Sequence, residues 1–244
     1  MTGQVVDTET ARELMREVLV SITEEEQGAI AAELGEKHER FRERLAGPGL
    51  AARLSPADLR LLLRSIFSTR RRVRDFVEGP AATELPARID ELLHSPAPLD
   101  VRFQTFCDGL SAFPATIRHD LASELLHFTF PGDYWLWTRW VWDAGTRTGA
   151  LPLVTMDYEL TGPSLGESYL RVGRATAFLR ETGQAAGFTR IGGDDFGVDV
   201  FLACVYCVYV YTTVRMRMTR EFNRVIPELP ELARRFLGVY RMES

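Results

Sequence analysis

Residues 113–143 read "FPATIRHDLASELLHFTFPGDYWLWTRWVWD" and join a helical pattern to a block of aromatic residues. Pro114 precedes a run in which Leu121, Leu125 and Phe128 recur at helical intervals, so we expect a helix to begin at Pro114. The run leads into Pro and Gly residues that are typical of a turn. All four tryptophans of the chain follow within eight residues: Trp135, Trp137, Trp140 and Trp142.

The tryptophan cluster favours packing over catalysis. On a helix the four side chains would spread around the circumference, which fits an element that is buried on several sides. Stacking on bases or lining an apolar ligand pocket are the alternatives. We predict core or interface packing, and the interface version makes all four side chains candidate contacts for a protein partner or a second copy of the chain.

The N-terminal segment is acidic and has a helical pattern. Residues 1–48 hold 11 acidic and 6 basic side chains, which accounts for the whole net charge of −5. Thr23 and Glu26 have capping-box spacing, and Gly47-Pro48-Gly49 ends the pattern. We therefore predict an acidic helical segment over 1–48 and a main helical domain over 49–244.

The main domain shows further helical patterns. Ser55 and Pro56 are typical of a helix start, and the helix is expected to run to about Val77. Further helices are expected over about 85–94, 100–110, 165–181 and 230–237. The apolar run 200–214 favours a helix, although its Val and Tyr content also suits a strand. The predicted fold is mainly α, a multi-helix globular bundle with room for one short strand or hairpin near 151–160 or 198–214.

The stretch Gly192-Gly193-Asp194-Asp195-Phe196 resembles the GG[D/E]EF turn of diguanylate cyclases. Gly162, Gly166, Glu167 and Leu170 loosely match the segment that precedes the turn in that family. The resemblance implies nucleotide and metal binding and covers about 45 residues. The FKxxND-like loop of the family is absent, so we predict a turn followed by a helix cap at Asp194 or Asp195.

The stretch 110–139 resembles the helix-hairpin-helix region of DNA glycosylases, which implies an all-helical fold that contacts nucleic acid. Ala115, Thr116 and Ile117 replace the hairpin glycines that expose backbone N–H groups to phosphate. The matching positions are Leu110, Pro114, Leu121, Ala122, Leu125, Leu126, His127, Phe128, Pro131, Asp133, Tyr134, Trp137 and Arg139.

A run of arginines supplies the candidate nucleic-acid contacts. The sequence "STRRRVRDF" places four of them late in the expected helix 55–77, where they are usually solvated and complement the helix dipole. The alternative is a phosphate-binding patch. Its members would be Arg70, Arg71, Arg72, Arg74 and Arg139.

Two other patterns have the spacing of metal or redox sites. Glu91-x-x-His94 and Glu124-x-x-His127 repeat the Glu-x-x-His pairs of carboxylate-bridged metal bundles. Cys204 and Cys207 form a CxxC, but they lie inside an apolar run where cysteine behaves as a small hydrophobe. We predict no cofactor and keep a carboxylate–histidine metalloprotein as an alternative.

Composition limits the classes of function. Three cysteines are too few for a disulfide framework, no secretory signal is expected, and the 15-residue apolar run is too short to span a bilayer, so we expect a cytoplasmic protein without a membrane span. The leading hypothesis is a non-catalytic interaction or assembly protein that binds a protein partner. A nucleic-acid-binding protein of degenerate helix-hairpin-helix type is the main alternative.

Overall fold

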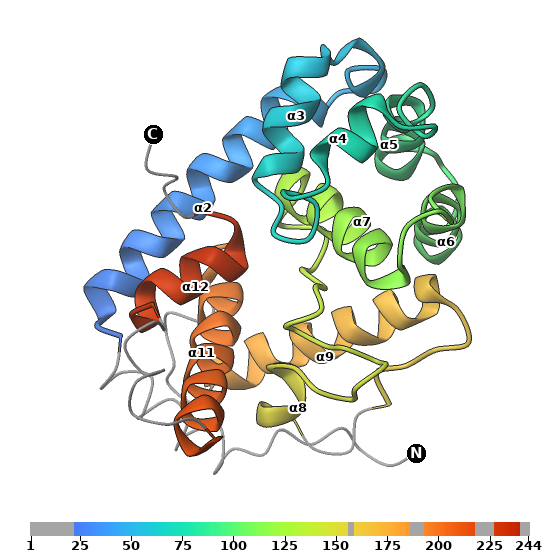
Figure 1. Ribbon diagram of the computed structural model, residues 1–244. Helices are drawn as coiled ribbons and strands as arrows, with labels where there is room; N and C mark the ends of the chain where they lie inside the picture. The colour runs from blue at the N-terminus through green and yellow to red at the C-terminus, as the bar shows by residue number, and fades with distance from the viewer. Residues whose placement is uncertain (1–21, 156–158, 186–192, 218–226, 240–244) are drawn as a thin grey trace. The chain divides into compact units, whose positions relative to one another are not determined.

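The computed structural model describes residues 22–155, 159–185, 193–217 and 227–239 (Figure 1). These residues form ten α-helices and one 3₁₀ helix, with no strand among them, so the predicted mainly α, multi-helix fold is confirmed. No helix in this described part is long and apolar enough to cross a membrane. The elements are α2 (Glu24–Leu45), η1 (Ala51–Arg53), α3 (Pro56–Arg64), α4 (Val73–Glu78), α5 (Leu85–His94), α6 (Leu99–Gly109), α7 (Ala115–Thr129), α8 (Leu151–Val154), α9 (Leu165–Ala185), α11 (Gly197–Arg217) and α12 (Leu229–Leu237).

The chain divides into two compact units. Of the described residues, unit 1 contains 22–34, 140–155, 178–185, 193–217 and 227–239, and unit 2 contains 35–139 and 159–177. The helices α2 and α9 contribute residues to both units. The division at residue 48 stays a prediction.

Three helix starts have side-chain caps, and those at Thr23 and Ser55 are the ones predicted above. The Thr23 hydroxyl accepts the N–H of Glu26 at 3.2 Å, while the Glu26 carboxylate accepts the N–H of Thr23 at 2.8 Å. The Ser55 hydroxyl accepts the N–H of Asp58, and the Ser164 hydroxyl accepts the N–H of Glu167, each at 3.1 Å. Each cap satisfies an N–H group that the first helical turn leaves without a partner.

The core of unit 2 is built around α7. Its residues 119–129 are all buried, and both α5 and α6 pack against it. A helix buried on every side cannot leave its polar side chains without hydrogen-bond partners, because each lost bond has a high free-energy cost in a dry interior. The segments that pack against α7 therefore have to supply hydrogen-bond partners for its polar side chains.

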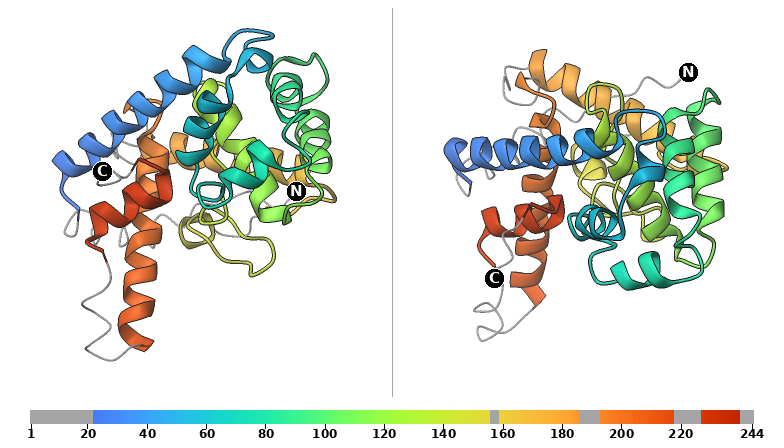
Figure 2. Two further views of the ribbon diagram at one scale, coloured as in Figure 1. Left: turned by 45° about the horizontal axis from the view of Figure 1, so that its top comes forward. Right: turned by 90° about the horizontal axis from the view of Figure 1, so that it is seen from above.

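In unit 1 the helices α11 and α12 lie side by side (Figures 1 and 2). The indole N–H of Trp140 donates to the carbonyl of Phe236 at 3.2 Å and links Trp140 to α12 within this unit. Cys204 and Cys207 are buried within α11, and burial raises the pKa of both thiols, that of Cys204 to about 12. Both cysteines therefore behave as small apolar residues, as the sequence predicts.

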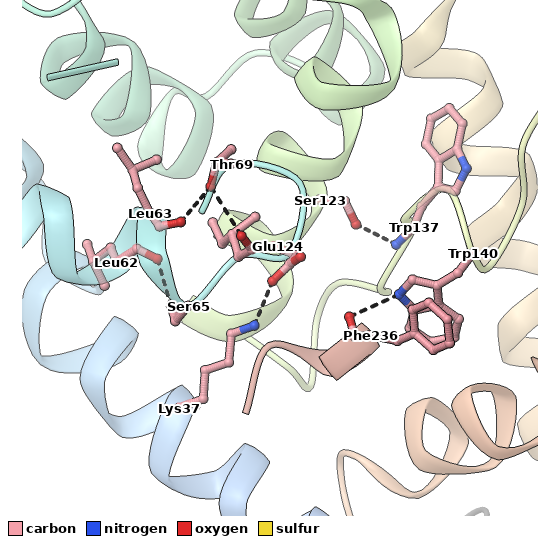
Figure 3. Close-up of polar contacts among 11 residues, drawn as sticks. Lys37, Leu62, Leu63, Ser65, Thr69, Ser123, Glu124, Trp137, Trp140 and Phe236 are labelled. Atoms are coloured by element: carbon pink, nitrogen blue, oxygen red, sulfur yellow. Dashed lines mark hydrogen bonds and ion pairs between the residues drawn. The ribbon is translucent and has the colours of Figure 1, made fainter. Parts of the chain in front are cut away.

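The prediction of one helix over 55–77 is wrong, because α3 ends at Arg64 and α4 begins at Val73. Two side-chain hydroxyls bond the carbonyls at the end of α3 (Figure 3): Ser65 donates to Leu62 at 2.7 Å, and Thr69 donates to Leu63 at 2.6 Å. Hydroxyl groups compete in this way with the backbone bonds that would continue a helix.

The strand expected as an option near 198–214 is not formed, because these residues belong to α11. Near 151–160 the described residues contain the short helix α8, while 156–158 lie outside them. The nearest approach to a strand pair is one isolated antiparallel bridge, between Asp143 and Thr148. It closes the turn "DAGTRT", in which Arg147 has a left-handed backbone with φ of 56°.

Candidate functional site

The tryptophan segment, residues 134–139, is not helical, and the reason lies in α7. Residues 134–138 have no regular secondary structure. The Ser123 hydroxyl accepts the N–H of Trp137 at 2.5 Å, and the Asp120 carboxylate accepts the N–H of Arg139 at 2.9 Å (Figure 3 shows the first bond). Side chains of α7 thus take the place of the helical or strand partners that this backbone would otherwise need.

Two further side chains hold the start of the segment. His127, one helical turn beyond Ser123 on the same face of α7, uses Nδ1 to bond the Tyr134 carbonyl at 2.7 Å. The Tyr169 hydroxyl of α9 donates to the Trp135 carbonyl at 3.0 Å. The segment is therefore fixed at each end by buried side chains.

Three of the four candidate contact tryptophans are buried. Trp137, Trp140 and Trp142 are buried, and Trp137 stacks on the ring of His119 with centroids 4.2 Å apart. Trp135 is half-buried and packs beside Gly173, where a Cβ atom would approach its ring within 2.9 Å. The packing role expected for the cluster is thus met inside the chain for three members, and Trp135 alone keeps part of its surface open.

The two Glu-x-x-His pairs are engaged elsewhere. Glu91 is exposed on α5, His94 bonds the carbonyl of Leu45 at 2.8 Å, and His127 bonds the tryptophan segment. Within the described residues, no group of three or more His, Cys, Asp or Glu side chains is placed to hold a metal ion. The geometry therefore gives the metal hypothesis no support.

Glu124 instead pairs with Lys37, a residue that the sequence interpretation missed. Lys37 is the chain's only lysine. Its side chain has no exposed surface, because it lies on the buried, apolar face of α2. Its Nζ is 2.6 Å from the Glu124 carboxylate (Figure 3). The same Nζ lies 3.9 Å from the centroid of the Phe128 ring. Burial raises the pKa of Glu124 to about 7, and Lys37 opposes that rise. In the sequence, the one signal for this buried ion pair is that a charged residue, Lys37, stands within the apolar stripe of its helix.

The Gly-Gly-Asp-Asp stretch forms a turn where it is described. Gly192 lies outside the described residues, while the Asp194 carboxylate accepts the N–H of Phe196 at 2.8 Å, one residue before α11 begins. This confirms the predicted turn before α11, and the helix cap at Asp194 or Asp195 stays a prediction.

The candidate phosphate-binding arginines do not lie late in a helix. Residues 70–72 occupy the turn before α4, and Arg74 is the second residue of that helix. The Arg70 guanidinium lies 4.4 Å from the ring centroid of Phe67. Arg72 is 3.8 Å from Asp75, and Arg74 is 2.9 Å from Glu78. Arg71 and Arg139 are exposed.

The outer face of α3 is the unusual surface of unit 2. We call it the α3 outer stripe, and its members are Ala57, Arg60, Leu61 and Arg64, spaced i, i+3, i+4 and i+7. The opposite face of α3 is buried. Leu61 is 45% exposed, and Val101 at 48% is the only other large apolar side chain in the described part of the chain with comparable exposure.

The stripe belongs to a strongly basic stretch. Residues 53–74 contain seven arginines and one acidic residue. Arg60 bonds Glu78 at 3.2 Å, and Glu78 also bonds Arg74, so these two arginines hold the pKa of Glu78 below its ordinary value. Arg64 is exposed and has no ion pair among the described residues. Sequence reasoning singled out the consecutive arginines and missed the helical spacing that sets Leu61 between Arg60 and Arg64.

No protein-family model, curated protein or solved structure matches this chain. On the described surface of unit 2 two features stand out, the basic α3 outer stripe and the half-buried Trp135. The stripe is the better supported of the two, because it combines charge with the exposed leucine.

Proposed function

We propose that this chain is a non-catalytic assembly protein that binds a protein partner through the α3 outer stripe. The exposure of Leu61 between two arginines carries the proposal. An apolar centre with a charged border, rich in arginine, is the composition typical of protein interfaces. Covering the exposed part of a leucine side chain would contribute about 1 kcal/mol of binding free energy.

The side chains and backbone of the α3 outer stripe are ordered before a partner binds. The Ser55 cap fixes the start of α3, and the ion pair with Glu78 holds Arg60 in place. Because these groups are already ordered, a partner would lose less conformational entropy on binding them than it would on binding a mobile loop. The net positive charge of the stretch favours an acidic partner.

Nucleic acid is the other ligand class for these arginines. Phosphate contacts would use the positive charge but would leave Leu61 exposed, since a phosphate backbone offers no apolar surface to cover it. Arg72 and Arg74 also have carboxylates beside them, which weakens their attraction for phosphate. These observations favour a protein partner.

The test is photo-crosslinking in the native host, with a photoreactive amino acid at position 61 and a control at position 101. Val101 is the matched control because its exposure is similar and it lies on α6. We expect a discrete protein adduct from position 61 that resists nuclease, is absent from position 101, and is lost with Arg60→Glu/Arg64→Glu. Adducts to nucleic acid alone, or equal adducts from both positions, would contradict the proposal.

A further inference from the structure

The α3 outer stripe needs a partner surface with two properties. It must be acidic, to meet Arg64, and it must be smooth enough for Leu61 to approach closely. One exposed surface of this same chain has both properties, and it lies on α2.

The exposed face of α2 is acidic at its start and lined by small residues after it. Residues 22–36 contain five glutamates and no basic residue. Glu25, Ala29 and Ala32 are exposed and are spaced i, i+4 and i+7, so they share one face of the helix, which we call the α2 acidic stripe. Glu25 has no ion pair among the described residues.

The ends of the two stripes align when the helices run antiparallel. Counted back from Arg64, Leu61 and Ala57 follow after three and seven residues, and counted on from Glu25, Ala29 and Ala32 follow after four and seven. Setting Arg64 against Glu25 therefore places Ala57 beside Ala32, and it places Leu61 within one residue of Ala29, about 1.5 Å along the axis. Small side chains at these positions let two helices pack closely.

The helix ends match as well. Arg64 is the last residue of α3 and Glu25 the second residue of α2, so the antiparallel arrangement sets an arginine at one helix's C-terminus against a glutamate at the other's N-terminus. Both charges complement the dipole of their own helix. The contact therefore joins charges that each helix already favours.

From this complementarity we infer that the partner is a second copy of this chain, whose α2 acidic stripe packs antiparallel on the α3 outer stripe. The inference rests on the proposed function. Each copy carries both surfaces, so the contact can form twice in a two-fold pair or repeat along a chain of copies. A contact over one short helix is small, so the association depends on concentration and weakens as salt screens the charges.

The experiment is sedimentation velocity of the full chain over a wide concentration range, at low salt and at about 0.5 M salt. We expect self-association of the wild type that decreases at high salt. Arg64→Glu alone and Glu25→Arg alone should each be monomeric, because each sets like charges against one another. An equimolar mixture of these two variants should associate again, because contacts between unlike copies then join opposite charges. The double variant should associate as well, because all of its contacts join opposite charges.

Two controls make the result specific. Arg139→Glu changes the net charge as much as Arg64→Glu but lies outside both stripes, so it should leave the association unchanged. Circular dichroism of each variant verifies that the helices are intact. A wild type that stays monomeric at low salt, or association that neither single variant affects, would overturn the inference. A monomeric wild type that still gives a protein adduct at position 61 would leave the proposed function standing with a different partner.

Discussion

Replacing Lys37 by methionine tests whether the buried ion pair anchors α2 to α7. The change keeps the length of the side chain but removes its charge, so Glu124 loses the ammonium group that lies 2.6 Å away. The pair is 0% and 2% exposed, so water cannot replace the missing partner. Breaking a buried pair by removing one member typically costs about 3–5 kcal/mol of stability.

The structure favours the lower end of that range. Because burial raises the pKa of Glu124 to about 7 even beside Lys37, the carboxyl of the variant can take up a proton instead of staying charged and unpaired. The lost contact of the ammonium group with the Phe128 ring, 3.9 Å from its centroid, adds about 1 kcal/mol. We therefore expect Lys37→Met to lower the free energy of unfolding by about 3–4 kcal/mol at pH 7.

Urea unfolding followed by circular dichroism measures this free energy. The matched control is the double variant Lys37→Met/Glu124→Leu, which removes both charges and leaves an apolar contact. It should recover most of the loss, because apolar replacement of a buried pair is often neutral or stabilising. A single variant within 1 kcal/mol of the wild type, or a double variant as unstable as the single one, would refute this account of the pair.

The remaining predictions concern pH, packing and backbone geometry. Burial raises the pKa of Glu124 from 4.5 to about 7, so between these pH values the folded chain holds a proton that the unfolded chain has released. The contribution of the Glu124 carboxyl to the free energy of unfolding therefore falls as the pH rises from about 4.5 to about 7. Glu124→Gln should show a flatter dependence of this free energy on pH. Gly166→Ala should lower the melting temperature and reduce the free energy of unfolding by about 3 kcal/mol, because its Cβ would lie 2.0 Å from a backbone oxygen of α6. Gly35→Ala has open space around its Cβ and should increase the free energy of unfolding by about 0.5–1 kcal/mol. Equal effects of the two variants would contradict the packing around Gly166. Ser123→Ala should cost about 1–3 kcal/mol in urea unfolding, because it leaves a buried N–H of the tryptophan segment without its acceptor, and a neutral result would disprove that bond's role. Arg147→Gly should raise the melting temperature through a gain of up to about 1 kcal/mol, because glycine tolerates the left-handed backbone there, and a loss would contradict this.

Sequence patterns identified candidate contact residues but did not predict which of them are exposed. Consecutive arginines and clustered tryptophans stand out in a sequence, so both were singled out. Which of them reach the surface depends on long-range packing: α7 draws Trp137 inward through Ser123, while Leu61 stays exposed because α3 is short and buries only its opposite face. Neither outcome follows from spacing along the chain alone.

The sequence by itself determined the helical class and most helix starts, because a cap at Thr23, Ser55 or Ser164 bonds a group only three residues away. Such local bonds do not depend on the rest of the fold. Tertiary structure alone decided the partners of Lys37 and of the tryptophan segment, since these bonds join α7 to other elements and span from 7 to 87 residues along the chain. A buried polar group has to be satisfied by whatever the fold brings beside it, and that neighbour exists only once the helices have packed.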